Sequence, residues 1–121
     1  MQIVRIQTNI RNADIPEKFE QDISYNLSSV MDLPADKFVI IIEPAIRICV
    51  GFGSKETPVA VVSFQTTRPS SQTENDQYAK KLTTVLREQL KLDPNNIFIS
   101  FDYKDSKNFA IQGKTIASLY Q

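Results

Sequence analysis

The chemistry that this sequence could perform starts at its first residue. Residues 1–9 alternate in polarity, so that Val4, Ile6 and Thr8 share one face of an extended strand. We therefore expect a strand that begins at the chain terminus and carries the α-amine of Met1 into the folded body. Such an amine, which can accept or donate a proton, is the most interesting chemical group in the sequence. The alternative is structural, with the strand tying down an end that would otherwise fray.

Few other residues could do catalytic or metal chemistry. The sequence contains no His and a single cysteine, Cys49. A zinc site or a catalytic triad would therefore have almost no ligands or bases to draw on, and an intramolecular disulfide is excluded. We expect no metal and no cofactor, and we expect Cys49 to act as a small apolar residue.

Composition and charge are those of an ordinary globular chain. Of its 121 residues, 41% are hydrophobic and 23% are charged, which predicts one domain over 1–121. Fourteen basic residues balance 14 acidic ones, so no net field attracts nucleic acid or an anionic membrane. The longest apolar run, 38–42, is far too short to cross a membrane, and no signal peptide is visible. We expect neither nucleic-acid binding nor membrane insertion.

The remaining elements read as two copies of one unit. A loop with Asp14 as the helix N-cap leads to an amphipathic helix over 16–31, and residues 38–42 form the next strand. The apolar helix positions return in the second half at the same spacing, where Phe19, Ile23, Leu27 and Met31 are matched by Tyr78, Leu82, Leu86 and Leu90. Residues 61–66 mirror the first strand and residues 97–101 mirror the second. The pattern predicts pseudo-repeats over about 1–44 and 58–103, followed by a tail over 104–121.

Two such units predict an α+β fold. Each unit is a βαβ crossover with parallel strands, and joining the two edge to edge gives a four-stranded sheet with both helices on one face. The face toward the helices is strongly apolar, with Phe38, Ile40, Ile42, Ala60, Val62, Phe64, Ile97, Ile99 and Phe101. The other face is mixed, with Arg5, Gln7, Val39, Ile41, Val61, Ser63, Gln65, Phe98 and Ser100. A mixed face without covering helices argues for self-association.

Two connecting segments complete the prediction. Residues 47–52 are expected to form a short extra strand between the units. Residues 109–119 are expected to supply further edge pairing, to this sheet or to that of a neighbouring subunit.

Motifs in a fixed order carry a resemblance to a known family. They are Thr8-Asn9 followed by Ile15-Pro16 and Phe19, then Leu33-Pro34-Ala35-Asp36, residues 53–60, residues 90–99, Asn108-Phe109 and Gly113-Lys114-Thr115. Together they resemble the macrophage migration inhibitory factor family of the tautomerase superfamily, which includes D-dopachrome tautomerase, over nearly the whole chain. The resemblance implies a homotrimer of the duplicated βαβ unit, with the sheets around a central channel.

At the family's catalytic position this sequence has Gln2. The resemblance implies that a proline there becomes the N-terminus after removal of Met1, and that its amine moves the proton between the keto and enol forms of phenylpyruvate-like substrates. Because initiator Met is usually removed only before small residues, we expect Met1 to stay. The amine would then be primary and displaced by one residue, and an ordinary α-amine titrates at about 7.7–8.0. If Met1 were removed, the new terminal Gln2 could cyclise to a neutral lactam.

The other pocket positions also depart from the family. The resemblance places a lysine that holds the substrate carboxylate at Leu33, which carries no charge, and Arg68 or Arg47 is the candidate replacement. The remaining implied pocket residues are Ile3, Thr66 and Thr67 from one subunit and Phe98, Ser100 and Phe109 from its neighbour. The cysteine pair of some members is replaced by residues 59–62, so oxidoreductase activity is not expected, and Asn12 and Ala45 replace the receptor-binding Arg and Asp of the vertebrate cytokine.

Two hypotheses follow. The first is a non-catalytic or impaired, cytokine-like or regulatory trimer, a pseudoenzyme, which the residues at positions 2 and 33 favour. The second is a weak or altered-specificity tautomerase, an isomerase that uses the Met1 amine on phenylpyruvate-like or dopachrome-like substrates. A third interpretation, in which Gln2 replaces a native proline in a variant, is also compatible with the sequence. The expected partner is a cell-surface receptor or an intracellular protein, with the chain in the cytoplasm or secreted without a signal peptide, as the resemblance implies.

Overall fold

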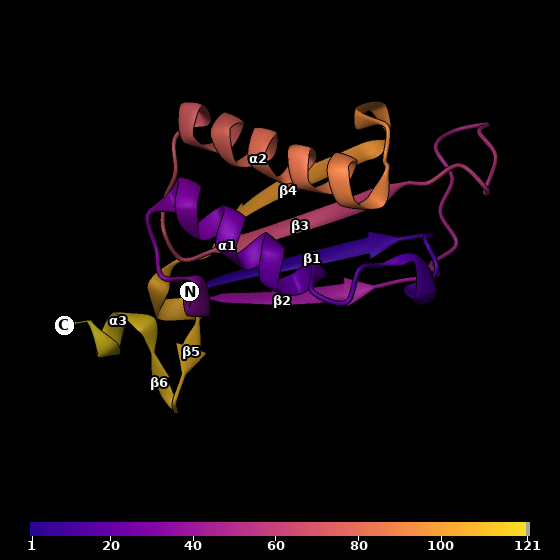
Figure 1. Cartoon of the computed structure of the whole chain (residues 1–121). Helices are drawn as coiled ribbons and strands as arrows, with labels where there is room; N and C mark the ends of the chain where they lie inside the picture. The colour runs from indigo at the N-terminus through magenta and orange to yellow at the C-terminus, as the bar shows by residue number, and fades with distance from the viewer. Residues whose placement is uncertain (121) are drawn as a thin grey trace.

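A four-stranded mixed sheet forms the centre of the fold. The structure, a computed structural model, describes residues 1–120. The strands are β1 (Gln2–Thr8), β2 (Phe38–Glu43), β3 (Ala60–Thr66) and β4 (Ile97–Tyr103), in the order β2-β1-β3-β4 (Figure 1). β1 pairs with β2 and β3 with β4 in parallel, while β1 and β3 run antiparallel in the middle. The predicted joining of two βαβ units edge to edge is confirmed.

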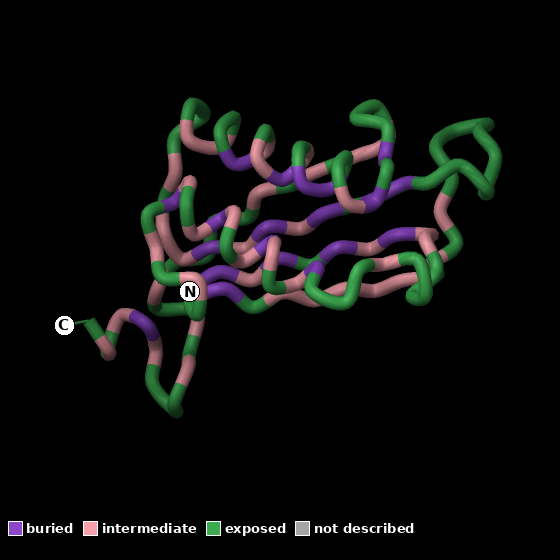
Figure 2. The backbone as a smooth tube through the Cα atoms, viewed as in Figure 1, coloured by how far each residue is buried: buried purple, intermediate pink, exposed green. Residues whose placement is uncertain are grey.

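Two long helices cover one face of this sheet. They are α1 (Phe19–Met31) and α2 (Gln72–Leu90), and Figure 2 shows the buried parts of the helices and strands facing one another. The register places Val4 beside Ile40 and Phe64, and Phe64 beside Phe101. The alternation of the strands therefore puts one apolar layer under the helices, and the predicted α+β fold is confirmed.

The two helices begin differently. At α2, Ser71 accepts from the Glu74 backbone N–H and the Glu74 side chain accepts from the Ser71 N–H, which satisfies two free donors of the first turn. At α1, the N-cap is Lys18 and no side chain caps the helix. The predicted Asp14 N-cap is wrong, because Asp14 ends a separate 3-10 turn and pairs with Arg11 at 3.0 Å. The helix accordingly starts three residues later than predicted, at Phe19.

The connection between the two units contains no strand. The predicted strand over 47–52 is absent, because a turn interrupts it: Gly51 has φ of 56°, and the Gly53 N–H donates to the Val50 carbonyl at 2.8 Å. The segment is held instead by Asn9. Its side-chain amide donates to the carbonyls of Lys55 and Thr57 and accepts from the Val59 N–H.

The C-terminal tail lies close to the N-terminus, where β1 begins. It contains β5 (Ala110–Ile111), β6 (Lys114–Thr115) and the one-turn helix α3 (Ile116–Leu119). Gln112 and Gly113, with φ of 58° and 76°, make the tight turn between β5 and β6. These two strands form a small sheet of their own, so within residues 1–120 the tail adds no strand to the main sheet. Figure 1 shows the tail close to the N-terminus.

Four short 3-10 turns complete the secondary structure. They are η1 (Asn12–Asp14), η2 (Ala35–Lys37), η3 (Pro94–Asn96) and η4 (Ser106–Asn108). η2 and η3 occupy equivalent places, immediately before β2 and β4. Among residues 1–120, no helix has both the length and the apolar character needed to cross a membrane.

Candidate functional site

The Met1 amine is fixed in place by one side chain. It donates to Thr67 Oγ1 at 3.0 Å. The Met1 carbonyl accepts from the Thr67 backbone N–H at 3.2 Å and from its hydroxyl at 3.4 Å. Because Thr67 follows directly after β3, whose last residue Thr66 pairs with Gln2, the central antiparallel pair of strands positions the amine.

The surroundings of this amine favour its neutral form. Burial, as the larger cause, and the positive charge of Lys37 both hold the pKa of the Met1 amine below its ordinary value of 8.0. Both effects disfavour the ammonium form. More of this amine is therefore unprotonated at neutral pH than in an ordinary chain terminus, and only the unprotonated amine can accept a proton.

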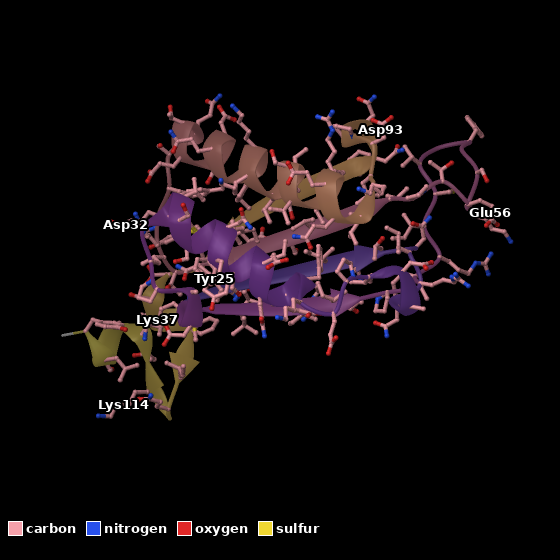
Figure 3. The ribbon with its side chains drawn as sticks, in the orientation of Figure 1. Tyr25, Asp32, Lys37, Glu56, Asp93 and Lys114 are labelled. Carbon is pink, nitrogen blue, oxygen red and sulfur yellow. The ribbon has the colours of Figure 1, made fainter. Side chains whose placement is uncertain are left out.

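A pocket of about 180 Å³ opens beside the amine. Met1 and Lys37 line one part of it, while the C-terminal tail contributes the remaining lining residues, Ile111, Gln112, Ile116, Leu119 and Tyr120. Figure 3 shows Lys37 between the start of β2 and the tail. Among residues 1–120, no acidic residue lines the pocket, and Ile111, Ile116 and Leu119 give it apolar walls.

Gln2 belongs to the core of the subunit. Its side chain is 2% exposed, and its Nε2 donates to Thr66 Oγ1 at 3.2 Å, while Oε1 has no hydrogen-bond partner. Gln2 shares the face of β1 with Val4 and Ile6, under the helices. Its side chain therefore does not line the pocket beside Met1. Thr66, the last residue of the inner strand β3, is likewise buried.

Two other predicted site residues also lie apart from the amine. Leu33 packs against the hydrophobic core and is not among the residues that line the Met1 pocket. Ile3 lies on the open face of the sheet, in a hollow of about 250 Å³ that it shares with Arg5, Ile41, Ser63, Gln65 and Asp102.

Phe98, Ser100 and Phe109 were predicted to reach the pocket of a neighbouring subunit. Within a single chain, Phe98 and Ser100 lie far from Met1. Phe98 pairs with Val61, which pairs with Gln7 at the far end of β1. At about 3.3 Å per residue, Phe98 is roughly 20 Å from Met1 along the strand. Ser100 lies at the level of Ser63 on the same open face. Phe109 is half-buried in the tail, where its carbonyl accepts from the Ile116 N–H at 2.8 Å. Within one chain, therefore, neither Phe98 nor Ser100 lies near the amine.

Lys37 is the site residue that sequence reasoning missed. The two arginines considered for this charge are elsewhere: Arg68 donates to the Met31 carbonyl at 2.7 Å, and Arg47 lies in the segment between the units. The register of the sheet places Lys37 next to Met1. Gln2 pairs with Phe38, so the residue before Phe38 must lie next to the residue before Gln2.

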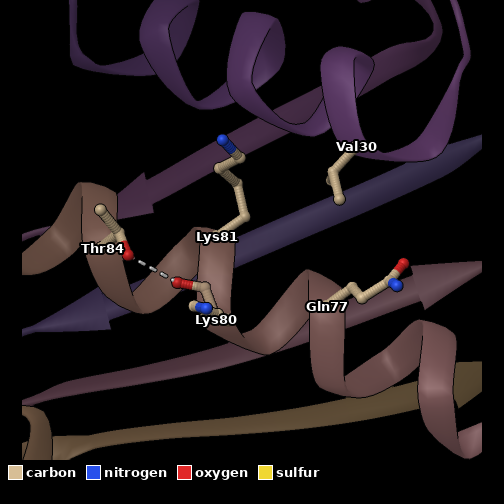
Figure 4. Close-up of a pocket in the computed structure, with 5 residues that line it drawn as sticks. All are labelled: Val30, Gln77, Lys80, Lys81 and Thr84. Carbon is tan, nitrogen blue, oxygen red and sulfur yellow. Dashed lines mark hydrogen bonds between the residues drawn. The ribbon is translucent and has the colours of Figure 1, made fainter.

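The hollow between the two helices has fewer groups that are free to react or to bind a ligand. This hollow of about 270 Å³ lies between α1 and α2 and is lined by Val30, Gln77, Lys80, Lys81 and Thr84 (Figure 4). The Thr84 hydroxyl donates to the Lys80 carbonyl at 2.9 Å, so it is engaged by its own helix. Within residues 1–120, no cluster of three or more His, Cys, Asp or Glu residues is placed to hold a metal ion.

Comparison with known proteins shows which family has this sequence pattern and fold. A sequence model of the family described as macrophage migration inhibitory factor matches residues 1–117. The chain belongs to the macrophage migration inhibitory factor family. Macrophage migration inhibitory factor from Xenopus laevis is 26% identical over 117 residues, covering 97% of this chain and all of that protein. The MIF-like protein mif-2 of Caenorhabditis elegans is 25% identical, covering 97% of this chain and 96% of that protein.

Solved structures of the family share the fold. Macrophage migration inhibitory factor from Oncomelania hupensis superposes with a TM-score of 0.87 at 16% identity, covering 95% of this chain and 82% of that chain. The protein from Trichinella spiralis superposes with a TM-score of 0.86 at 22% identity, covering 93% and 98%. The predicted family resemblance is confirmed, and at these identities the structures support the fold alone.

Proposed function

We propose that this protein is a macrophage migration inhibitory factor-like homotrimer with a cytokine-like or regulatory role, in which the family's keto–enol tautomerase chemistry is impaired. The observation that carries the proposal is the position of the first two residues. The Gln2 side chain is part of the core, and the terminal nitrogen is a primary amine on Met1, bonded to Thr67. The nitrogen is thus one residue away from the place that the family resemblance gives to the catalytic base.

The trimer is supported by the open face of the sheet. Val39, Val61 and Phe98 are each more than a third exposed there, although a monomer would gain by covering such apolar side chains. Phe98 and Ser100 also lie too far along the sheet to meet the amine of their own chain. A symmetric assembly would satisfy both features by covering the face and bringing these residues to another subunit's pocket.

A weak tautomerase that uses the Met1 amine is the second candidate. The lowered pKa of this amine and the charge of Lys37 favour it. In this reaction the neutral amine would take the proton from the carbon beside the substrate ketone, the C–H electron pair would form the enolate, and the enolate oxygen would gain a proton. The same steps in reverse would return the ketone. A general base commonly supplies about 10²–10⁴-fold in rate, so a displaced base predicts a slow reaction.

Two measurements test the proposal. Sedimentation of the full chain should give the mass of three subunits, whereas a monomer would contradict the trimer. Enolisation of phenylpyruvate by protein whose intact mass includes Met1 should be slow or absent, whereas rapid turnover would contradict the impairment. Reductive methylation of the amine separates the candidates, because slow turnover that depends on the amine should change after methylation and turnover by trace contaminants should not.

A further inference from the structure

We propose that the Met1 amine is a site of reversible covalent modification by carbon dioxide, which converts it to a carbamate. The inference goes beyond the proposed function, because it requires that Met1 is retained but not that the subunits assemble or turn over a substrate. Three features of the amine support it: its accessibility, the ease with which it loses its proton, and the charge beside it.

The amine is accessible and has room to be modified. Met1 is half-buried and lines the pocket of about 180 Å³, which leaves space for the small carboxyl group that the reaction adds. The amine donates a hydrogen bond to Thr67 Oγ1 at 3.0 Å. Because the nitrogen of a carbamate made from a primary amine keeps one hydrogen, the modified nitrogen can still donate to this hydroxyl.

The amine is readily available in the form that reacts. Only a neutral amine has a free electron pair with which to attack the carbon of carbon dioxide. Burial and the charge of Lys37 hold the pKa of the Met1 amine below 8.0, and a lowered pKa is a general way of activating an amine nucleophile. By contrast, an amine that titrates at about 10.4, as lysine does in model peptides, is almost entirely protonated at neutral pH.

The charge beside the amine favours the product. The carbamate carries one negative charge, and the register of β1 and β2 places Lys37 next to Met1. Among residues 1–120, Lys37 makes no ion pair and no acidic residue lines the pocket; Tyr120, on the tail, is the remaining titratable residue of the lining. Lys37 therefore acts twice in the same direction, since it disfavours the ammonium form before the reaction and attracts the carbamate after it.

The reaction is balanced and needs no cofactor. The electron pair of the Met1 nitrogen forms a bond to the carbon of carbon dioxide, and one C–O π pair moves onto oxygen. The nitrogen then gives one proton to water, which leaves a carbamate with a single negative charge. Protonation of the nitrogen and loss of carbon dioxide reverse these steps. Because the carbamate nitrogen shares its electron pair with the new carboxyl group, Met1 cannot act as a base while it is modified.

Isotope labelling identifies the modified nitrogen. The full chain is labelled with ¹⁵N-methionine, its intact mass is checked for Met1, and ¹³C-labelled carbon dioxide is added at neutral pH. The methionines are Met1 and Met31, and the nitrogen of Met31 is a backbone amide, which does not react. A ¹³C carbamate resonance that is split by ¹⁵N therefore reports Met1 alone. We expect this resonance in the wild-type protein.

Charge variants test the surroundings of the amine. Lys37→Gln should lower the ratio of carbamate to free amine at neutral pH by about two- to fivefold, the range for an exposed charge pair. Above pH 8.0, at the same concentration of dissolved carbon dioxide, the loss should be smaller, because both amines are then mostly neutral. Lys37→Arg should retain the wild-type ratio. Lys18, also exposed and also beside a turn, lines none of the hollows described above, so Lys18→Gln should behave as wild type.

Four outcomes would overturn the inference. They are an intact mass without Met1, no ¹⁵N-coupled resonance from protein that retains Met1, an unchanged ratio in Lys37→Gln at neutral pH, and an equal loss in Lys18→Gln. The subunit mass and the rate of enolisation without added carbon dioxide are measured separately. The carbamate and the proposed function can therefore each fail without the other.

Discussion

At the residue scale, Met1 has two neighbours with different effects. Thr67 fixes the position of the amine through its hydroxyl, and Lys37 opposes its protonation through charge. Burial acts in the same direction as Lys37 and is the larger cause. The amine is consequently both oriented and easily deprotonated, which are two requirements of a general base. In the proposed function it lacks the third, the position that the family resemblance assigns to the base.

Replacing Lys37 by Gln should raise the pKa of the Met1 amine while leaving it below 8.0, because the charge is removed and the burial remains. Titration of the labelled Met1 amine by NMR measures this directly, with Lys18→Gln as the control. Since the folded pKa is the lower one, the unfolded chain binds this proton more tightly. The group's contribution to stability is therefore complete above pH 8.0 and is lost as the pH falls through the folded pKa. An unchanged or lower pKa in Lys37→Gln would contradict the assignment.

The site residues could be predicted from the sequence only in part. The terminal strand and its amine follow from the alternation of residues 1–9, and the placement of the amine beside Thr67 follows from the pairing of β1 with β3. The direction of the Gln2 side chain also follows from that alternation, since Gln2 shares the parity of Val4 and Ile6. The role of Lys37 could not be read from composition or motif, because it depends on the register between β1 and β2 and on the fold of the tail.

At the element scale, the spacing of apolar residues predicted the position of every long strand and helix. The residues of the neighbouring turns determine where these elements begin and end. The four strands of the main sheet and the two long helices are those that alternation and helical spacing predicted. The absent strand over 47–52 shows the limit, because Gly51 and the turn at Val50–Gly53 override an apolar run. The segment between the units depends instead on Asn9, whose side chain bonds to three backbone groups across it.

Replacing Asn9 by Ala should lower the free energy of unfolding by about 1–3 kcal/mol, because three hydrogen bonds of ordinary net strength are lost at a partly exposed site. Urea unfolding monitored by circular dichroism measures the change. Asn12→Ala is the matched control, since Asn12 is exposed in η1 and its side chain makes no hydrogen bond within residues 1–120. Equal stability of Asn9→Ala and Asn12→Ala would show that the segment between the units is held by other contacts.

At the scale of the whole molecule, the two faces of the sheet differ in what covers them. The helices cover one face completely enough that Val4, Ile6 and Phe64 have no exposed surface. The other face carries exposed Phe98 together with the Arg5–Glu43 ion pair, whose atoms are 3.6 Å apart. Such a mixed surface suits an interface that retains some water, and the proposed trimer would cover it.

Replacing Phe98 by Asp should dissociate the proposed trimer, because the substitution puts an unpaired charge into a face that the assembly would cover. Sedimentation of the variant should give a smaller mass than the wild type. Tyr25→Asp is the control, since Tyr25 is also an exposed aromatic, 66% exposed, but lies on α1. If the two variants have the same assembly state as the wild type, the interface lies elsewhere.

The central claim is that the family's scaffold is retained while its proton-moving nitrogen is displaced. The most direct measurement is the ratio of kcat/KM for phenylpyruvate enolisation between Gln2→Pro, checked by intact mass for loss of Met1, and the wild-type protein. Proline is tolerated at the first residue of a strand, and circular dichroism confirms the fold of the variant. We predict a gain of about 10²–10⁴-fold, the usual contribution of a positioned general base. A ratio near one would contradict the claim.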